Sequence, residues 1–390
     1  MAIPLKITIS LLACALLGLG SWALASRAAA DGGLTVPDPA EIDDVICLSG
    51  CLKLRETTPG GSIQVTGTGM RAVTALSFKG EDGRIRQRPS KRTADRLVVP
   101  VPTGARSGRV RALGVGGAKS APSPKVLSVG SKRDLGDPGG QLTILDASVS
   151  PRKSYRYGRK KPTLDFVITG GEERNDLRFD IVSADRTVVA SIYRKSVPTN
   201  SVESVTWNGR ATDKRPVKSG RYRFVIRRAD GTQAELASRL LRESEGSPLR
   251  VSVYGYKFPV RGPHQYWDGI GAGRGHQGLD IGADCGTRIV AARGGRVYWN
   301  DYQASGAGYY VVINVAGTGG KSHAYMHLTK RSPLKQGQFV YTGQKIGTVG
   351  LTGRTTGCHL HFELWSKPGW YQGGTFLDPT RPMKYWDSYS

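Results

Sequence analysis

Five of the six histidines in this sequence fall in three short segments of its C-terminal part, residues 276–280, 323–328 and 359–363. In the last of these, His359 and His361 lie two residues apart between apolar neighbours. Alternate residues of a β-strand point to the same face, so both imidazoles are expected to aim at one spot. This grouping indicates a functional site rather than scattered surface histidines.

The other two segments add a carboxylate and three more imidazoles. His276 and Asp280 are four residues apart, a spacing that puts both on one face of a helix or of an extended segment. Glycines at 273, 275, 278 and 282 disfavour a helix, so an extended segment is predicted. His323 and His327 have the same spacing and are expected to share one face of a strand.

Two imidazoles and one carboxylate can hold a catalytic zinc ion with an open fourth position for water. His276, Asp280 and His361 would be these ligands, and the metal would lower the pKa of the water toward about 7. A peptidase also needs groups that move protons, and no H-E-x-x-H motif places a glutamate for that task. His327 and His359 are the candidates. The same ligand types occur in non-haem iron oxygenases, so they leave the metal open.

The segment that carries these residues is predicted to be an antiparallel β domain over 251–386. Strand-like runs occur at 297–299, 309–313 and 339–341, glycines mark tight turns, and no long helical periodicity is present.

Residues 253–382 resemble the lysostaphin/LytM-type zinc metallopeptidases. The resemblance rests on His276-x-x-x-Asp280, Cys285-Gly-Thr-Arg-Ile-Val-Ala-Ala292, Tyr325-Met-His327-Leu328, Gly343-Gln-Lys-Ile-Gly347, Thr352-Gly-x-Thr-x-Gly-Cys-His359-Leu-His361-Phe-Glu363 and Asp378-Pro379. It implies a β-sheet groove of the duplicated hybrid motif type and endopeptidase action on peptidoglycan peptides. It also implies one zinc ion per chain bonded by His276, Asp280 and His361, with His327 and His359 as the catalytic pair.

Some residues depart from the pattern. His323 stands where no functional histidine is expected and is interpreted as a rim or packing residue. His264 is expected to be structural or to line the groove. Some relatives place a tyrosine shortly before the first ligand to stabilise the oxyanion, and Tyr266 is not assigned to that role. Arg274 and Arg354 could line the groove or be solvated.

Two alternatives to catalysis follow from the same sequence. One is a non-catalytic protein of the same fold that binds the wall or activates a partner hydrolase. The other is a wall-binding protein whose charge and N-terminal modules do the main work. Because all five proposed ligand and catalytic positions are filled, catalysis is favoured. The bond that is cut does not follow from the sequence.

The N-terminus indicates export. Lys6 precedes an apolar run over 7–24 and small residues follow, so residues 1–30 are predicted to be a signal peptide. A retained membrane anchor is the competing interpretation, because the run is long enough to span a bilayer. A secreted or cell-envelope location in a bacterium is expected.

Export changes how the cysteines are interpreted. Four remain after residue 30, and an even number outside the cytosol indicates two disulfides. Cys285 follows Asp280 and Cys358 precedes His359, so these two are predicted to pair. Cys47 and Cys51 form the other pair.

The formal net charge of +25 and the pI near 10.0 indicate attraction to polyanions. For an exported protein the available polyanions are anionic wall polymers and anionic lipid head groups, and peptidoglycan is the expected substrate. No nucleic-acid partner is expected, since no nucleic-acid-binding motif accompanies the charge.

The part of the chain before residue 251 is also predicted to be β. After a linker at 31–42, residues 43–130 resemble TIG-type immunoglobulin-like domains through turn residues at 60–69 and 101–108. Residues 138–237 resemble the immunoglobulin-like domain of flagellar hook-capping proteins through 206–210 and 217–222, with Trp207 in the core. The expected fold class is therefore mostly β: two Ig-like sandwiches followed by the metallopeptidase domain.

Overall fold

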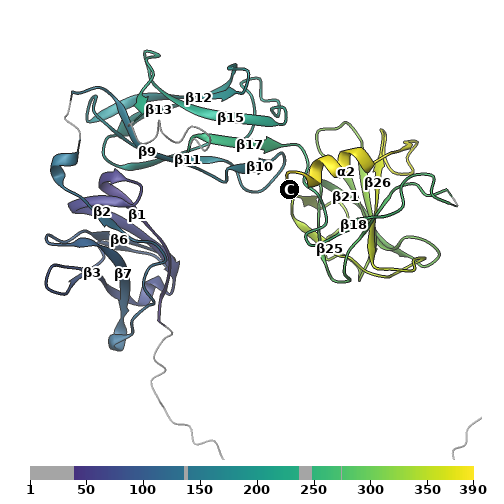
Figure 1. The fold of residues 1–390 in the computed structure, drawn as a ribbon, viewed down its shortest axis with the longest axis horizontal. Coiled ribbons are helices and arrows are strands. Elements are labelled where there is room, and N and C mark those ends of the chain that lie inside the picture. The colour runs from purple at the N-terminus through teal and green to yellow at the C-terminus, as the bar shows by residue number, and fades with distance from the viewer. Residues whose placement is uncertain (1–38, 136–138, 237–247, 274) are drawn as a thin grey trace, which may run out of the picture. The chain divides into compact units, whose positions relative to one another are not determined.

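The computed structural model describes residues 39–135, 139–236, 248–273 and 275–390. Over these residues the chain forms six β-sheets and one short α-helix, so the mostly β fold class is confirmed (Figure 1). The expected signal peptide or anchor at 1–30 lies outside the described residues. Within the described ranges, no helix is long and apolar enough to cross a membrane.

The first β domain packs two sheets around an apolar core. Inward-facing residues such as Ile63 and Val65 alternate with partly exposed ones, which is the period-2 pattern of a half-buried strand. A disulfide joins Cys47 to Cys51. The larger sheet contains β1 (Glu41–Lys53), β2 (Glu56–Thr68), β6 (Arg96–Pro100), β5 (Lys91–Arg92) and β8 (Ser128–Val129), and the smaller contains β4 (Arg84–Gln87), β3 (Val73–Lys79) and β7 (Arg106–Gly114).

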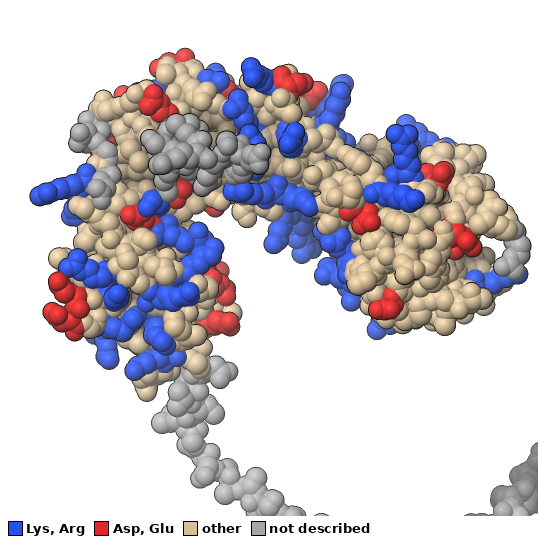
Figure 2. Space-filling model, in the orientation of Figure 1, with Lys and Arg blue, Asp and Glu red and all other residues tan. Residues whose placement is uncertain are grey.

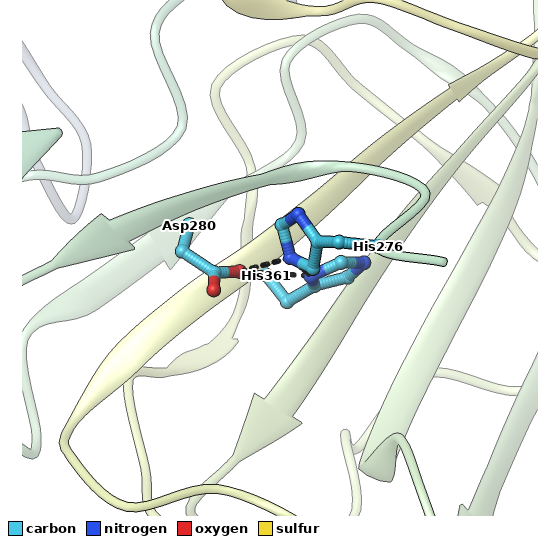
Figure 3. A group of neighbouring side chains, drawn as sticks. All are labelled: His276, Asp280 and His361. Carbon is cyan, nitrogen blue, oxygen red and sulfur yellow. Dashed lines mark hydrogen bonds and ion pairs between the residues drawn. The ribbon is translucent and has the colours of Figure 1, made fainter. Parts of the chain in front are cut away.

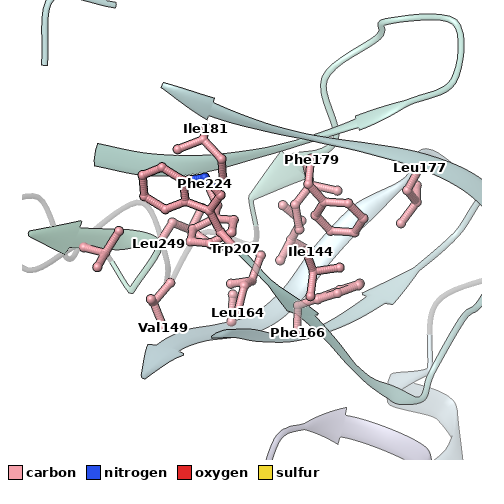
Figure 4. Packing of buried hydrophobic residues seen from close by; sticks show 14 of the residues in the cluster. Ile144, Val149, Leu164, Phe166, Leu177, Phe179, Ile181, Trp207, Phe224 and Leu249 are labelled. Atoms are coloured by element: carbon pink, nitrogen blue, oxygen red, sulfur yellow. The ribbon is translucent and has the colours of Figure 1, made fainter. Parts of the chain in front are cut away.

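The second β domain also has two sheets with a shared core (Figure 4). Trp207 is buried in it as expected, and its indole N–H donates to the carbonyl of Arg210 at 2.8 Å. One sheet has the order β10 (Lys153–Tyr155), β17 (Arg250–Tyr254), β15 (Gly220–Arg228), β12 (Arg174–Ser183) and β13 (Val188–Pro198), and the other has the order β14 (Val202–Thr206), β11 (Thr163–Thr169), β9 (Thr143–Ser150) and β16 (Glu235–Leu236).

Strand β17 belongs to the second domain, whereas the sequence placed residues from 251 onward in the C-terminal domain. It pairs with β15, and Val251 and Val253 are buried in the core of the second domain. Its sequence Arg-Val-Ser-Val-Tyr alternates like any strand, so periodicity alone did not indicate which sheet it joins.

The C-terminal domain has a large antiparallel sheet and a two-stranded one. Helix α2 (Thr380–Asp387) buries Met383 and Trp386 against its core, and sequence analysis did not predict this short helix. The large sheet has the order β18 (Gln265–Tyr266), β19 (Leu279–Gly282), β26 (His359–Trp365), β23 (Ser322–Leu328), β22 (Gly308–Val315), β21 (Gly295–Gln303) and β24 (Phe339–Val340), with β27 (Phe376–Leu377) paired to β26. The small sheet contains β20 (Arg288–Val290) and β25 (Lys345–Thr348).

Three adjacent strands of the large sheet, β19, β26 and β23, carry most of the histidine-rich segments. A disulfide between Cys285 and Cys358 joins the loop after β19 to the residue before β26, with the two Cα atoms 5.2 Å apart. The strands that hold the site are therefore linked by hydrogen bonds along their length and by a covalent bond at one end.

Candidate active site

Strand register brings two of the proposed ligands together. Strands β19 and β26 are antiparallel, and Asp280 lies directly opposite His361 while Gly282 lies opposite His359. Residues directly opposite one another in such a pair share a face. Gly278 lets the strands approach, because a Cβ there would lie 2.7 Å from the Nε2 atom of His361.

The side-chain atoms of the three proposed ligands lie close together. The Nε2 atom of His276 lies 3.1 Å from Oδ1 of Asp280 and 3.0 Å from Nδ1 of His361. That Nδ1 atom lies 2.8 Å from the same carboxylate oxygen (Figure 3). Together the three residues could hold a metal ion.

Hydrogen bonds at the ring nitrogens that face away from the cluster orient the imidazoles of His276 and His361. His276 donates its Nδ1–H to the carbonyl of Gly269 at 2.8 Å, which leaves Nε2 toward the cluster. His361 has its Nε2 atom 3.3 Å from Oε1 of Glu363, which leaves Nδ1 toward the cluster. A partner on the far nitrogen is the usual way in which a protein fixes a metal-binding imidazole.

Charge is concentrated at this cluster. Burial acts most strongly on both His361 and Asp280 and disfavours their charged forms. Their mutual hydrogen bond, with Glu363 on the other side of the ring, outweighs burial and raises the pKa of His361 to about 9. The same bond and the neighbouring imidazoles hold the pKa of Asp280 below its ordinary value.

The second histidine pair lies beside the cluster. The ring centroids of His327 and His359 are 4.6 Å apart, and Nε2 of His359 is 3.5 Å from Oδ1 of Asp280. Each ring places Nδ1 2.8 Å from a backbone carbonyl, that of Thr352 for His327 and that of Gly357 for His359. If each Nδ1–H donates there, each Nε2 is left as the basic nitrogen.

Burial is the main reason that the pKa of His327 is lowered to about 4. The neighbouring rings of His359 and His361 lower the pKa further, while the carbonyl of Thr352 and the carboxylate of Asp280 raise it. His327 is therefore neutral near pH 7.

His327 reaches the groove through an irregularity in β23. Met326 pairs with His361 and shares its face, so regular alternation would turn His327 to the opposite face. His327 instead has φ 58°, which is uncommon for a residue with a side chain and costs of order 1 kcal/mol or more. The expectation that His323 shares its face was therefore wrong. His323 is buried against Tyr256, Phe362 and Trp386 on the other side of the sheet.

The remaining residues singled out from the sequence take different positions. His264 lies 3.0 Å from a carboxylate oxygen of Asp387, to which Tyr266 also donates, so both residues help to anchor α2. Arg354 lines the groove and is exposed, while Arg274 lies outside the described residues.

Trp267 forms a wall of the groove that the sequence did not reveal. Its ring lies 5.7 Å from that of His359 and remains 47% exposed. A Cβ at Gly282 would lie 2.2 Å from this indole, so the glycine admits it.

The groove contains the metal cluster and the histidine pair together. It is lined by Trp267, Asp268, Ala272, Gly273, Gly275, His276, Gln277, Asp280, Ser305, Gly306, Ala307, Met326, His327, Gly353, Arg354, Thr355, Thr356, Gly357, His359, His361 and Glu363. Glu363 was part of the sequence motif but was given no role. Its position two residues after His361 on the same strand was the signal that could have identified it.

Residues 274–379 match Peptidase family M23. A relative from Vibrio cholerae, named peptidoglycan DD-endopeptidase ShyC, is 43% identical over 118 residues, which are 30% of this chain and 26% of the relative. Lysostaphin from Staphylococcus simulans is 35% identical over 28% of this chain and 20% of the relative. Its solved catalytic domain is 29% identical, covers 31% of this chain and 92% of that chain, and has a TM-score of 0.29.

Both curated matches span about a quarter or less of the relatives' own length. The family match covers the part of the chain that holds the histidine clusters, and the motifs from His276 to Pro379 that carried the sequence resemblance lie in it. The chain therefore carries a peptidase family M23 domain in its C-terminal part.

Proposed function

We propose that this protein is a zinc-dependent endopeptidase that hydrolyses peptide bonds in peptidoglycan stems or cross-bridges. The observation that carries the proposal is the convergence of His276, Asp280 and His361 in one groove beside His327 and His359. The names of the relatives, which include peptidoglycan endopeptidases, support the substrate class.

The donor set fits zinc. Two neutral imidazole nitrogens and one carboxylate oxygen are ligands of catalytic zinc sites, which keep a further position open. The separations of 2.8 to 3.1 Å between the ligand atoms are slightly shorter than the roughly 3.3 Å that tetrahedral bonds of about 2 Å require. Small rotations of the side chains would make up the difference.

The residues divide into holders of the metal and carriers of protons. Zinc bound there would supply Lewis-acid activation of water and of the scissile carbonyl. His327, neutral near pH 7, would accept a proton at Nε2, and His359 would complete the proton transfer toward the leaving amine. The carbonyls of Thr352 and Gly357 keep the basic nitrogens of this pair aimed into the groove.

The proposed location is secreted or in the cell envelope, with peptidoglycan as the partner. Lys and Arg side chains are spread over the visible surface of all three β domains (Figure 2). This distribution suits contact with anionic wall polymers.

Digestion of purified peptidoglycan of different cross-link types tests the proposal. Mass analysis should show new amino termini from one kind of peptide bond, and a chelator should abolish them until zinc is restored. Binding without any cleavage would instead support the alternative, a wall-binding or hydrolase-activating protein of the same fold.

A further inference from the structure

Glu363 is a buried carboxylate surrounded by N–H donors. Only 4% of the residue is exposed. Its Oε2 atom accepts hydrogen bonds from the indole N–H groups of Trp365 at 2.7 Å and Trp370 at 2.9 Å. Its Oε1 atom faces the Nε2 atom of His361 at 3.3 Å. Among the described residues, no Lys or Arg forms an ion pair with it.

The chemistry of the surrounding groups requires an acceptor at both oxygens. Both indoles can only donate, and an ionised carboxylate can only accept. A buried carboxylate is costly unless such bonds satisfy it. An amide in the same place would turn its NH₂ group toward either the two indoles or the imidazole, so one of these contacts would become donor against donor.

The need for a hydrogen-bond acceptor at Glu363 also affects His361, a proposed metal ligand. With both indoles on Oε2, Oε1 is left to accept the Nε2–H of His361. In the neutral imidazole, which is the form that binds a metal, that proton position leaves the lone pair on Nδ1, and Nδ1 is the atom that faces Asp280 and His276. The carboxylate thereby determines which nitrogen of His361 is available to a metal.

We propose that Glu363 is a positioning residue that fixes the tautomer and orientation of His361 for metal binding. The inference rests on the proposed function, since it concerns the affinity of the same site for zinc.

The same carboxylate also connects the site to the segment between β26 and β27. Trp370 lies in this segment, and the backbone N–H of Trp370 donates to the hydroxyl of Ser322 at 3.2 Å. The next residue, Tyr371, donates its hydroxyl proton to Gln277 at 3.0 Å, beside His276 in the sequence. A purely structural function, holding this segment through the two indoles, is thus the competing account of Glu363.

Two variants of the full-length chain separate these accounts. Glu363→Gln places a donor where an acceptor is needed, and it should weaken zinc affinity by about 10- to 100-fold in competition with a chromophoric chelator. Trp370→Phe is the matched control, because it removes one indole donor but leaves the contact of Oε1 with His361. It should lower the melting temperature of the metal-free protein and change zinc affinity by less than about 3-fold.

Imidazole NMR of the zinc-loaded protein gives a second measurement, first on the wild type and then on both variants. His361 should show a hydrogen-bonded Nε2–H proton and metal coordination through Nδ1. The same proton should persist in Trp370→Phe and lose its hydrogen-bonded shift in Glu363→Gln.

The proposal is overturned if Glu363→Gln keeps wild-type zinc affinity while the metal-free protein melts at a lower temperature, as a structural function requires. Coordination of zinc through Nε2 of His361 in the wild type would overturn it as well. Failure of the wild-type chain to bind zinc at all would count against the proposed function itself, so the two failures are distinguishable.

Discussion

The distances of the histidine nitrogens from the Asp280 carboxylate separate the four proposed site histidines into two groups. The atoms Nε2 of His276 and Nδ1 of His361 lie within 3.1 Å of the Asp280 carboxylate, whereas Nε2 of His359 is 3.5 Å away. His327 makes its described ring contacts with the other imidazoles and with the carbonyl of Thr352. His276, Asp280 and His361 are the proposed metal ligands, and His327 and His359 are the proposed proton-transfer pair.

Alanine substitutions should therefore have two different signatures. His276→Ala, Asp280→Ala or His361→Ala should strip zinc from the full-length protein, because three ligands form the minimum set of such a site. His327→Ala and His359→Ala should keep about one zinc per chain and lose roughly 10²- to 10⁴-fold in turnover. Metal analysis beside a peptidoglycan digestion assay measures both.

Either of two results would contradict this division. Full metal content in Asp280→Ala would remove the carboxylate from the ligand set. Loss of zinc from His327→Ala or His359→Ala as complete as from His361→Ala would make that histidine a ligand.

His323 gives the C-terminal domain a pH-dependent stability. Burial, and then the positive charges of Arg293 and Lys321, lower the pKa of His323 to about 3, against about 6.5 in an unfolded chain. Below pH 6.5 the unfolded state binds a proton that the folded state does not. Stability should therefore fall as the pH drops from about 6.5 toward 3, by at most roughly 1.4 kcal/mol per pH unit for this group.

Chemical denaturation of the metal-free full-length chain at several pH values measures this slope. His323→Phe suits the aromatic surroundings and should reduce the slope between pH 6 and 4 by close to one proton. The slope from His327, whose pKa is lowered in the same direction, should remain. An unchanged slope in His323→Phe would show that His323 takes up its proton without unfolding.

At the scale of elements, the site depends on how β19, β26 and β23 are aligned. The pairing of Asp280 with His361 follows from alternating strand faces, and so does the shared face of His359 and His361. These features could be predicted because they depend only on period 2. The reversal at His327 could not, because a bulged residue with positive φ interrupts the alternation and no local residue type signals it.

Contacts between distant segments could not be predicted from the sequence either. Strand β17 resembles any short strand until its partner β15 is known, and α2 is too short to give a clear helical period. The hydrogen bond from the indole of Trp370 to Glu363 forms only because the loop seven residues later folds back onto strand β26. Each of these features depends on tertiary packing rather than on local preference.

The disulfide between Cys285 and Cys358 should stabilise this arrangement of strands. It closes a loop with a sequence separation of 73 residues, worth roughly 4 kcal/mol in the chain-entropy description. Reductant, or a Cys285→Ser, Cys358→Ser double variant, should lower the melting temperature of the C-terminal domain in the full chain. The double variant should show no further response of that transition to reductant.

The other disulfide offers a matched control. Cys47 and Cys51 are four residues apart in the first β domain, so replacing them with Ser should leave the C-terminal transition unchanged. Peptide mapping of exported protein without reductant checks the bond between Cys285 and Cys358. Recovery of both cysteines as free thiols would show that this disulfide does not form.

At the scale of the whole molecule, the net charge of +25 should affect binding to the cell wall rather than peptide hydrolysis. Attraction between exposed charges is screened over about 10 Å at 0.1 M salt and about 3 Å at 1 M. Binding of the full-length protein to walls that carry anionic polymers should therefore fall steeply across this range. Sedimentation of the protein with insoluble walls measures it.

Hydrolysis of a short, neutral cross-linked peptide should depend much less on salt over the same range, because that substrate has little net charge to attract. Walls from which the anionic polymers have been removed chemically are the control, and they should bind with a shallower salt dependence. Equal salt dependence for intact and stripped walls would show that the positive charge does not recognise these polymers. In that case wall binding would have to come from contacts with peptidoglycan itself, and Arg354 at the rim of the groove would be the first residue to replace.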